Sequence, residues 1–408
     1  MELITTFANS NNKLLALNFT RKVFVMGNTS ADMDSVLSSI LLSFALNLSN
    51  GVFDSKLNDE KEINIKAREV LYLPLINTEH RFFISKLDIK YLFNLNGIDF
   101  NNLIFIDKIG NLLFDNQNVH LILVDHNKLD PMQEVFADKV IAVYDHHEDS
   151  NIKYKNLREK HLIYPIGSCS TIILMNYYVC NKEMINLFSN QNLEFLCTAI
   201  WLDTKGFLNN LKYERWIDLD LYTFEKISSN GKVNINVFSD LEKNKYNLQA
   251  NLELGIEYLM SKDLKNFEYK LSEHYFPLLN EDFKKSMNKN NFKVSIKWAS
   301  LQIGYFDISE KYGEESLLSY FQNQNSDIYI TNCDHKRNKI ITLHFNPLEN
   351  SNFSSQARNY FLNNFLKLTT ENMIEVLDSK VPHLSMFLMD MKVSRKTLEP
   401  IIRKLLEN

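Results

Sequence analysis

Aspartates and histidines follow several short apolar runs in the first half of the chain, a position suited to metal chemistry. An Asp-x-Asp pair lies just beyond Val23–Met26, a single aspartate follows Leu121–Val124, and Asp-His-His follows Val140–Tyr144. The apolar run Ala199–Leu202 also ends in an aspartate. The side chains concerned are Asp32, Asp34, Asp125, Asp145, His146, His147 and Asp203.

Crowding of these carboxylates would demand cations. Two carboxylates ~4 Å apart repel by several kcal/mol at an effective dielectric of ~20. Aspartate and histidine together suit Mg²⁺ or Mn²⁺ better than Zn²⁺, whose structural sites favour thiolates. Two ions ~3.5–4 Å apart, bridged by a shared carboxylate, would give the site of a metal-dependent phosphoryl hydrolase. The simpler alternative for each acid alone is a helix cap or a solvated loop residue.

The elements that would position these residues alternate along the first half of the chain. Short apolar runs alternate with stretches of helical periodicity, which is typical of βαβ units and a mostly parallel sheet flanked by helices. The predicted strands are 23–26, 70–76, 103–106, 121–124 and 140–144, and the predicted helices are 33–48, 168–178 and 193–202. Because the carboxyl ends of parallel strands share one edge, residues more than a hundred positions apart can converge there.

The second half of the chain predicts a smaller α+β domain with a mixed or antiparallel sheet. Strand candidates are 294–298, 300–305, 328–330 and 340–344, and the charged stretch 334–339 between the last two favours a solvated hairpin turn. Apolar periodicity lapses near Ser228. We therefore expect a first domain over 1–228, a linker over 229–245 and a second domain over 246–408.

Length and composition limit the classes of function. The 408 residues, 45% of them hydrophobic, suffice for two domains with proper cores. A net charge of −5 without a basic face argues against nucleic-acid binding. Four scattered cysteines favour a reducing compartment, and neither a signal peptide nor a membrane-length apolar run is evident. We expect a soluble, monomeric, cytoplasmic protein that does not bind membranes.

Around these acids the chain resembles the DHH phosphoesterase superfamily, in the branch of fungal cytosolic exopolyphosphatases, prune-type proteins and family II pyrophosphatases. The matching stretches are Gly27–Ser35, Leu123–Asn127, Tyr144–His147 and Leu202–Thr204, with the glycine-serine segment Gly167–Thr171 between the last two. In the second half, Val393–Lys396 resembles the Ser-Arg-Lys motif of the accessory domain, and Ser261–Phe267 resembles its Asp-x-Lys-x-Phe segment.

The resemblance implies a two-metal site in the first domain. It makes Asp32, Asp34, Asp125, His146 and Asp203 the metal ligands, with Asp125 as the bridge. Asp145 would orient His146, as metal-bound histidines require. His126 is expected to pack behind the ligands. Asn28 stands where family II pyrophosphatases have a histidine ligand, and an amide oxygen there would favour Mg²⁺ over Mn²⁺ or Co²⁺.

The resemblance also implies how a phosphate substrate is bound. His147 would reach the phosphate, while Lys265, Arg395 and Lys396 of the second domain would grip it across an interdomain cleft. Ser168 and Ser170 open a predicted helix and could offer N–H groups to a phosphate, although helix capping explains them equally well.

These implications lead to one leading hypothesis of function. The chain would hydrolyse terminal phosphoanhydride bonds of inorganic polyphosphate and release orthophosphate, using a water activated by two divalent ions, with His147, Arg395 and Lys396 assisting. Alternatives within the class are a pyrophosphatase and a prune-type hydrolase of short polyphosphates or nucleotides. An alternative of another class is a regulatory protein that binds phosphate ligands with a silent site.

Overall fold

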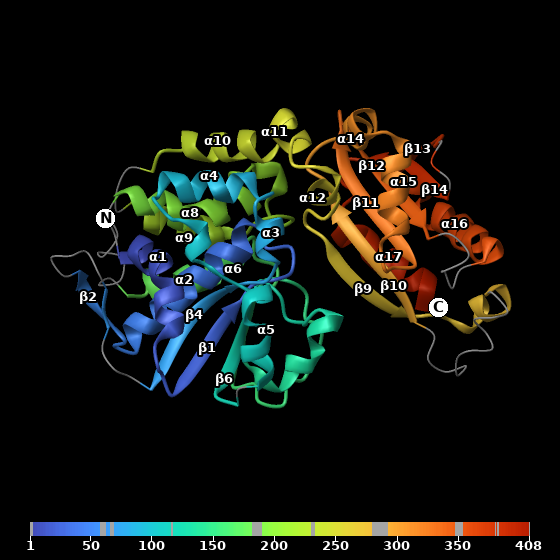
Figure 1. Ribbon diagram of the computed structural model, residues 1–408. Coiled ribbons are helices and arrows are strands. Elements are labelled where there is room, and N and C mark those ends of the chain that lie inside the picture. Colours follow the sequence, from blue (N-terminus) through green and yellow to red (C-terminus); the bar gives the residue numbers. More distant parts are fainter. Residues whose placement is uncertain are drawn as a thin grey trace. The chain divides into compact units, whose positions relative to one another are not determined.

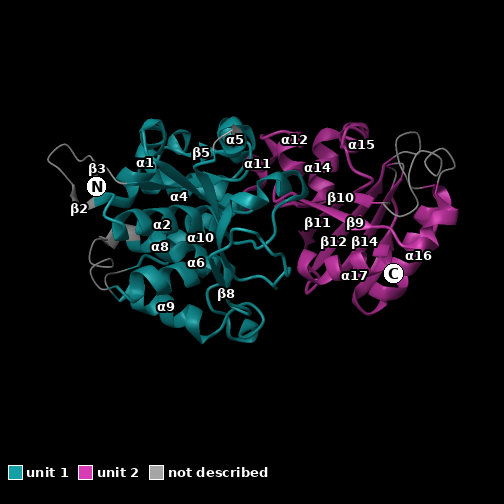
Figure 2. Ribbon diagram, turned by 90° about the horizontal axis from the view of Figure 1, so that it is seen from below, with its two compact units in different colours: residues 1–245 teal, residues 246–408 magenta. Residues whose placement is uncertain are grey.

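The computed structural model describes residues 3–57, 63–65, 69–115, 117–181, 190–229, 233–279, 293–346, 354–379, 381 and 383–407. The chain divides into two compact units, Met1–Lys245 and Tyr246–Asn408 (Figure 2). The second unit has the bounds expected for the second domain. No helix in the described ranges is both long and apolar enough to cross a bilayer.

Unit 1 is built on a six-stranded parallel sheet in the order β5-β4-β1-β6-β7-β8. Figure 1 labels β4, β1 and β6 of this sheet. Its strands are β1 Arg21–Met26, β4 Val70–Ile76, β5 Ile104–Phe105, β6 Val119–Val124, β7 Val140–Asp145 and β8 Glu159–Leu162. A separate two-stranded hairpin consists of β2 Phe53–Leu57 and β3 Ile63–Ile65. The expected α/β class with a parallel sheet is confirmed.

The central strands are apolar because both of their faces are covered. Residues 23–26 and 121–124 are buried without the alternation of a half-exposed strand, as expected for an interior parallel strand. The sequence missed β8, whose pattern is charged and partly exposed. An edge strand needs less apolar material, so it leaves a weaker signal in the sequence.

Helices pack against this sheet, and α2 is the most deeply buried of them. Fourteen of its residues are buried, including Leu37, Ile40 and Phe44. The helices of unit 1 are α1 Leu3–Ala16, α2 Met33–Ser49, α3 His80–Phe83, α4 Leu87–Leu95, α5 Ile106–Asp115, α6 Cys169–Ile173, α8 Asn190–Asp203, α9 Asp218–Ser228 and α10 Asn236–Lys245. Shorter helical turns are η1 Phe100–Asn102, η2 Pro131–Lys139, the π-helical η3 Leu174–Val179 and η4 Asn209–Leu211.

Unit 2 contains a mixed six-stranded sheet in the order β13-β14-β12-β11-β10-β9, in which only β10 and β11 pair in parallel. The strands are β9 Lys265–Lys270, β10 Lys293–Ser300, β11 Ile328–His335, β12 Asn338–Phe345, β13 Met373–Leu377 and β14 Leu384–Asp390. The charged stretch 334–339 forms the expected hairpin turn, where Lys339 pairs with Asp334 at 3.1 Å.

Helices cover both faces of this second sheet, which therefore has two apolar clusters. They are α11 Leu248–Leu252, α12 Ile256–Met260, α14 Tyr305–Tyr312, α15 Glu314–Gln322, α16 Ser355–Thr369 and α17 Arg395–Glu407, with short turns η5 Glu273–Leu278 and η6 Thr370–Asn372. The strand predicted over 300–305 is wrong. The chain leaves β10 after Ser300, and Gly304 precedes helix α14, which begins at Tyr305.

The expected linker also needs correction. Residues 236–245 form α10, whose Phe238 and Leu241 are buried in the core of unit 1. Their spacing of three residues fits a helix, but two apolar residues among polar neighbours are a weak sequence signal for a helix. Residues 230–232 of that stretch lie outside the described residues, as do 280–292 and 347–353, where no family motif was matched.

Asn47 of α2 supports the backbone of β4, and its loss should destabilise unit 1. The buried amide donates to the Tyr72 carbonyl at 2.6 Å and accepts from the Tyr72 N–H at 3.0 Å. Asn47→Leu should lower the free energy of unfolding by about 2–4 kcal/mol, because both backbone groups lose their partner. Asn50→Ala, which removes an exposed amide contact, is the matched control and should cost less than about 0.5 kcal/mol in the same urea titration. Equal effects of the two variants would contradict this role.

Candidate metal centre

Asp125 lies at the centre of the predicted site, immediately after β6. Its φ of 61° is in the left-handed region, which is unusual for a residue other than glycine. The turn is fixed by the Asp125 N–H, which donates to the Tyr144 carbonyl at 3.0 Å. It leaves the buried carboxylate facing His146, whose Nε2 lies 3.1 Å from Asp125 Oδ1.

The two histidines after β7 are oriented by different partners. His146 Nδ1 lies 2.9 Å from the Ile166 carbonyl, which leaves Nε2 on the side of Asp125. Asp145 contacts the ring of His147 instead, with its Oδ1 2.8 Å from Nδ1. Asp145 Oδ1 also accepts from the backbone N–H of His146, at 2.8 Å. The prediction that Asp145 orients the His146 ring is therefore wrong, because a backbone carbonyl takes that place.

Asp34 is held by the segment that begins α6. Its Oδ1 accepts from the hydroxyls of Ser168 at 2.8 Å and Ser170 at 2.7 Å and from the Ser170 N–H at 2.9 Å. Its Oδ2 accepts from the Cys169 N–H at 2.6 Å and lies 3.8 Å from His146 Nε2. Both serines are fully buried. Ser168 caps α6 and both serines donate to Asp34, which favours the capping alternative over phosphate binding.

Asn28 holds Asp125 in the same way. Its Nδ2 donates to Asp125 Oδ2 at 2.7 Å, while its Oδ1 accepts from the N–H and the hydroxyl of Ser30 at 2.9 and 2.6 Å. The expectation of an amide oxygen facing a metal is not met in this arrangement, because that oxygen caps the turn. Asp32 is the N-cap of α2 and accepts from the Ser35 N–H at 3.1 Å.

Electrostatics shows that the acids of unit 1 form one cluster. Burial, together with the charges of Asp32 and Asp34, raises the pKa of Asp125 from 3.8 to about 8. Burial and the same two neighbours raise the pKa of Asp203, the last residue of α8, well above its usual value. Asp145 differs: burial would raise its pKa, but the hydrogen bond and charge of His147 outweigh burial and lower it.

These donors fit a divalent cation. One ligand atom each from Asp125, Asp145, His146 and His147 lies within 4.8 Å of the others. Asp34 adds a carboxylate beside His146. Asp203 is close enough for the charges of Asp34 and Asp32 to raise its pKa. Buried carboxylate oxygens with imidazole nitrogens are donors that Mg²⁺ and Mn²⁺ accept. Of the residues predicted as ligands, Asp125 and Asp34 have oxygens 3.1 and 3.8 Å from His146 Nε2, and Asp32 and Asp203 interact electrostatically with the same acids.

Asn127 supports Asp145, a role that the sequence analysis did not predict. Its buried amide donates to Asp145 Oδ2 at 2.6 Å and to the Glu148 carbonyl at 2.9 Å. It follows His126, whose Nδ1 lies 2.9 Å from the Val124 carbonyl. Position within the Asp-His-Asn motif was the only signal, and it did not reveal which carboxylate the amide would contact.

Comparison with known proteins agrees with this geometry. Residues 22–200, which carry β1 to α8 and most of the predicted ligands, match the model described as "DHH family, N-terminal domain". Unit 1 carries a DHH-family domain. The chain is 24% identical over 378 residues to the Schizosaccharomyces pombe protein "Putative exopolyphosphatase", covering 88% of this chain and 83% of that one.

Two further similarities concern part of the sequence and the fold. The human protein "Exopolyphosphatase PRUNE1" is 25% identical over 246 residues, which are 59% of this chain and 48% of that protein. The crystal structure titled "Methanococcus jannaschii putative family II inorganic pyrophosphatase" superposes with a TM-score of 0.56 at 17% identity, covering 94% of this chain and 99% of that one. The latter shows a shared fold that extends beyond the DHH domain.

The cations predicted in unit 2 also lie near one another. Lys265 begins β9 and pairs in register with Trp298 of β10. Arg395, the first residue of α17, donates from Nη1 to the carbonyls of Asp263 at 2.7 Å and Trp298 at 3.3 Å. Lys396 follows it and is exposed. One end of β9, β10 and α17 thus presents the three predicted basic residues.

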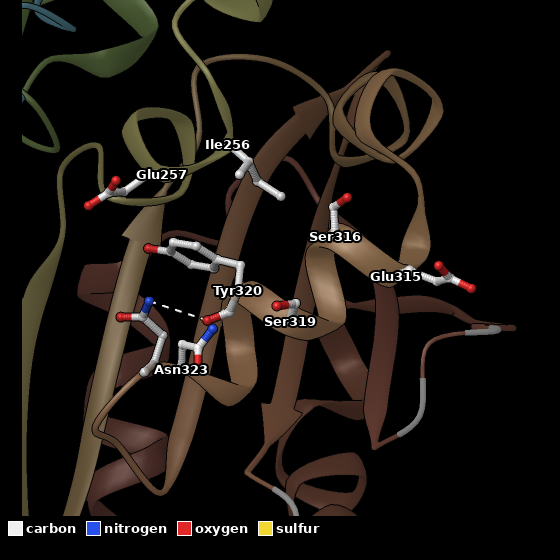
Figure 3. A pocket seen from close by; sticks show the side chains of 8 residues that line it. Ile256, Glu257, Glu315, Ser316, Ser319, Tyr320 and Asn323 are labelled. Carbon is white, nitrogen blue, oxygen red and sulfur yellow. Dashed lines mark hydrogen bonds between the residues drawn. The ribbon is translucent and has the colours of Figure 1, made fainter.

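A shallow groove elsewhere on unit 2 has different chemistry. Figure 3 shows it beside α15, which carries Tyr320 and is followed by Asn323. The side-chain amide of Gln324 donates to the Tyr320 carbonyl at 3.3 Å. Its lining is Ile256, Glu257, Glu315, Ser316, Ser319, Tyr320, Asn323 and Gln324. Two glutamates without a lining cation make it unsuited to a polyanion, and none of the predicted site residues belongs to it.

The raised pKa of Asp125 predicts how the metal-free DHH domain responds to pH. Between the unfolded value of 3.8 and the folded value of about 8, the folded state holds one more proton than the unfolded state. The free energy of unfolding should therefore fall by about 1.4 kcal/mol per pH unit as pH rises through that interval, and recover when a divalent cation binds the ionised carboxylates.

Thermal unfolding of EDTA-treated protein between about pH 5 and 8, with and without Mg²⁺, measures this effect. Asp125→Asn removes this titrating group and should reduce the slope by about 1.4 kcal/mol per pH unit, while Asp203, whose pKa is also raised, keeps its own contribution. A melting temperature of the wild-type chain that is independent of pH in EDTA would contradict the assignment.

Proposed function

We propose that this chain is a divalent-metal-dependent exopolyphosphatase, which releases orthophosphate from the end of inorganic polyphosphate. The observation that supports it most directly is the buried group of Asp125, Asp34 and His146, three donors brought together from three elements of a DHH-family domain. Similarity over 88% of the chain to a protein named as an exopolyphosphatase supports the choice of substrate. Mg²⁺ is the ion we propose, with Mn²⁺ or Co²⁺ as substitutes.

The proposed ligands are Asp32, Asp34, Asp125, His146 and Asp203. A bound divalent ion supplies Lewis acidity and lowers the pKa of a coordinated water toward neutrality. The protein's own contribution is to orient the donors. Asn28 donates to Asp125 Oδ2, and the backbone N–H of Cys169 donates to Asp34 Oδ2.

His147 is proposed to contact the phosphate group that is transferred. Its ring is about one quarter exposed, with 27% of the side chain accessible, whereas His146 is buried. The hydrogen bond between Asp145 and His147 Nδ1 fixes the tautomer, with Nδ1 protonated, and turns Nε2 away from Asp145. A histidine held in this way can donate or accept a proton at Nε2.

Lys265, Arg395 and Lys396 are proposed to neutralise the phosphates of the substrate. Two backbone carbonyls hold one nitrogen of the Arg395 guanidinium, so the group is oriented before the substrate arrives. A planar guanidinium suits two oxygens of one phosphate, whereas each lysine provides a point charge. No protein nucleophile is required by this scheme.

Parallel phosphate-release assays test the substrate and the metal site together. With Mg²⁺, we expect turnover of tripolyphosphate and long-chain polyphosphate, and a loss of more than about 100-fold in Asp125→Ala, since even residues behind a metal ligand cost 10–100-fold. Asp149→Ala, which removes an acid paired with Lys160 at 2.6 Å near the end of β7, is the control and should remain active.

The same assays separate the alternatives. Turnover of pyrophosphate alone would replace the proposal by a pyrophosphatase. Binding of phosphate ligands without any turnover would favour a regulatory protein. Full activity in Asp125→Ala would remove the metal assignment.

Arg395 is expected to bind substrate by geometry as well as charge. Arg395→Ala should lower kcat/KM for polyphosphate by about tenfold or more, and Arg395→Lys should restore only part of it, because a lysine cannot make the bidentate contact. Arg403→Ala is the control on the same helix, where the guanidinium pairs with Glu399 at 2.7 Å. Equal kinetics of Arg395→Ala and Arg403→Ala would exclude Arg395 from substrate binding.

A further inference from the structure

The segment Ile166–Thr171 supports two proposed metal ligands at once. The Ile166 carbonyl lies 2.9 Å from His146 Nδ1. The next residues of the segment bind Asp34, which accepts from the Ser168 hydroxyl, the Cys169 N–H and both donors of Ser170, at 2.6–2.9 Å. The position of this segment therefore sets the orientation of an imidazole and a carboxylate that come from different parts of the sheet edge.

Asp220 of α9 anchors that segment at both of its ends. Its Oδ2 accepts from the Gly167 N–H at 2.9 Å, and its Oδ1 accepts from the Thr171 hydroxyl at 2.6 Å. The side chain is fully buried. The two bonds fix the segment at Gly167 and Thr171, and the four groups that contact Asp34 lie between these points.

Tight packing prevents the segment from shifting independently of Asp220. A Cβ added at Gly167 would lie 2.7 Å from the Arg215 carbonyl, 2.8 Å from Thr204 Cγ2 and 3.2 Å from the Asp220 carboxyl carbon. Thr204 directly follows Asp203, a third proposed ligand at the end of α8. The backbone at Gly167 therefore lies wedged between Asp220 and the helix end that carries Asp203.

Asp220 also accepts from the Ile217 N–H at 2.9 Å, which caps α9. That bond by itself would stabilise the helix and nothing more. The bonds to Gly167 and Thr171 link the helix to a segment that lies 53 and 49 residues earlier in the chain. Helix capping therefore accounts for one of the three contacts, and the other two converge on the support of the proposed ligands.

We propose that Asp220 is a positioning residue of the metal centre, which fixes His146 and Asp34 in their binding orientation through the segment Ile166–Thr171. This inference rests on the proposed metal site but not on the identity of the substrate. Residues that orient metal ligands typically contribute 10–100-fold to metal affinity.

Binding of Mn²⁺ to the full chain, measured by isothermal titration calorimetry without substrate, tests this role. Asp220→Ala should raise the Kd for Mn²⁺ by about 10–100-fold. Asp220→Asn should remain within about threefold of wild type, because the amide oxygen can accept the two N–H donors and the Thr171 hydroxyl can accept from the amide nitrogen.

Asp327→Ala is the matched control. Asp327 is a buried carboxylate in unit 2 that accepts from the Ser295 N–H at 2.9 Å and its hydroxyl at 2.8 Å. This variant should lower thermal stability to a similar degree as Asp220→Ala but leave the Kd for Mn²⁺ unchanged. Should Asp220→Ala not fold, Thr171→Val removes one anchoring bond at nearly constant volume and should weaken Mn²⁺ binding about threefold.

Wild-type affinity in Asp220→Ala, or in Thr171→Val when it replaces that variant, would overturn the inference. A loss of Mn²⁺ affinity in Asp220→Asn as large as in Asp220→Ala would also overturn it, since the charge of Asp220 rather than its hydrogen-bond geometry would then matter. Absence of Mn²⁺ binding by the wild-type chain would overturn it too. A chain that binds Mn²⁺ in the expected order of variants but hydrolyses no phosphate substrate would refute the exopolyphosphatase proposal and leave the role of Asp220 standing.

Discussion

Mutual repulsion among buried carboxylates is the constraint on which the first unit depends. Asp125 and Asp34 are almost fully buried, and the charges of Asp32 and Asp34 add to burial in raising the pKa of Asp125. Such a group destabilises the fold unless protons, cations or hydrogen-bond donors offset the charge. The protein supplies donors on the outer side of each acid, from Asn28 to Asp125 and from the Ser168–Ser170 segment to Asp34. These donors and the proposed divalent cation would together offset the charge of the two acids.

The parallel sheet makes this crowding possible. β1, β6 and β7 are neighbours in the order of the sheet, so the residues that follow them meet at one edge although the chain has travelled more than a hundred residues between Asp32 and His146. The edge itself does not orient any side chain. Orientation comes from a layer of contacts behind the acids, in which backbone groups such as the Ile166 carbonyl and the Cys169 N–H take part as much as side chains do.

This layer also explains why some motif residues have other roles than their position suggested. Ser168 and Ser170 begin a short helix, where a phosphate could be bound, yet their donors are already used by Asp34. Asn28 was expected to offer its amide oxygen to a metal, yet its amide nitrogen rather than its oxygen faces Asp125. In both cases the buried carboxylate competes for the donor, and a charged acceptor forms the stronger hydrogen bond.

The sequence by itself determined the class of fold, the strands whose ends carry acids, and the family, because apolar runs of strand length and the motifs that follow them are local features. It also located Lys265, Arg395 and Lys396, which the structure brings to one end of β9, β10 and α17. Only the tertiary structure decided which donor faces which acid. Every residue except proline carries a backbone N–H and every residue a carbonyl, so the sequence does not distinguish the Cys169 N–H or the Ile166 carbonyl from any other. Asp220 was equally invisible, since its contacts to Gly167 and Thr171 depend on how α9 packs against a segment far away in the chain.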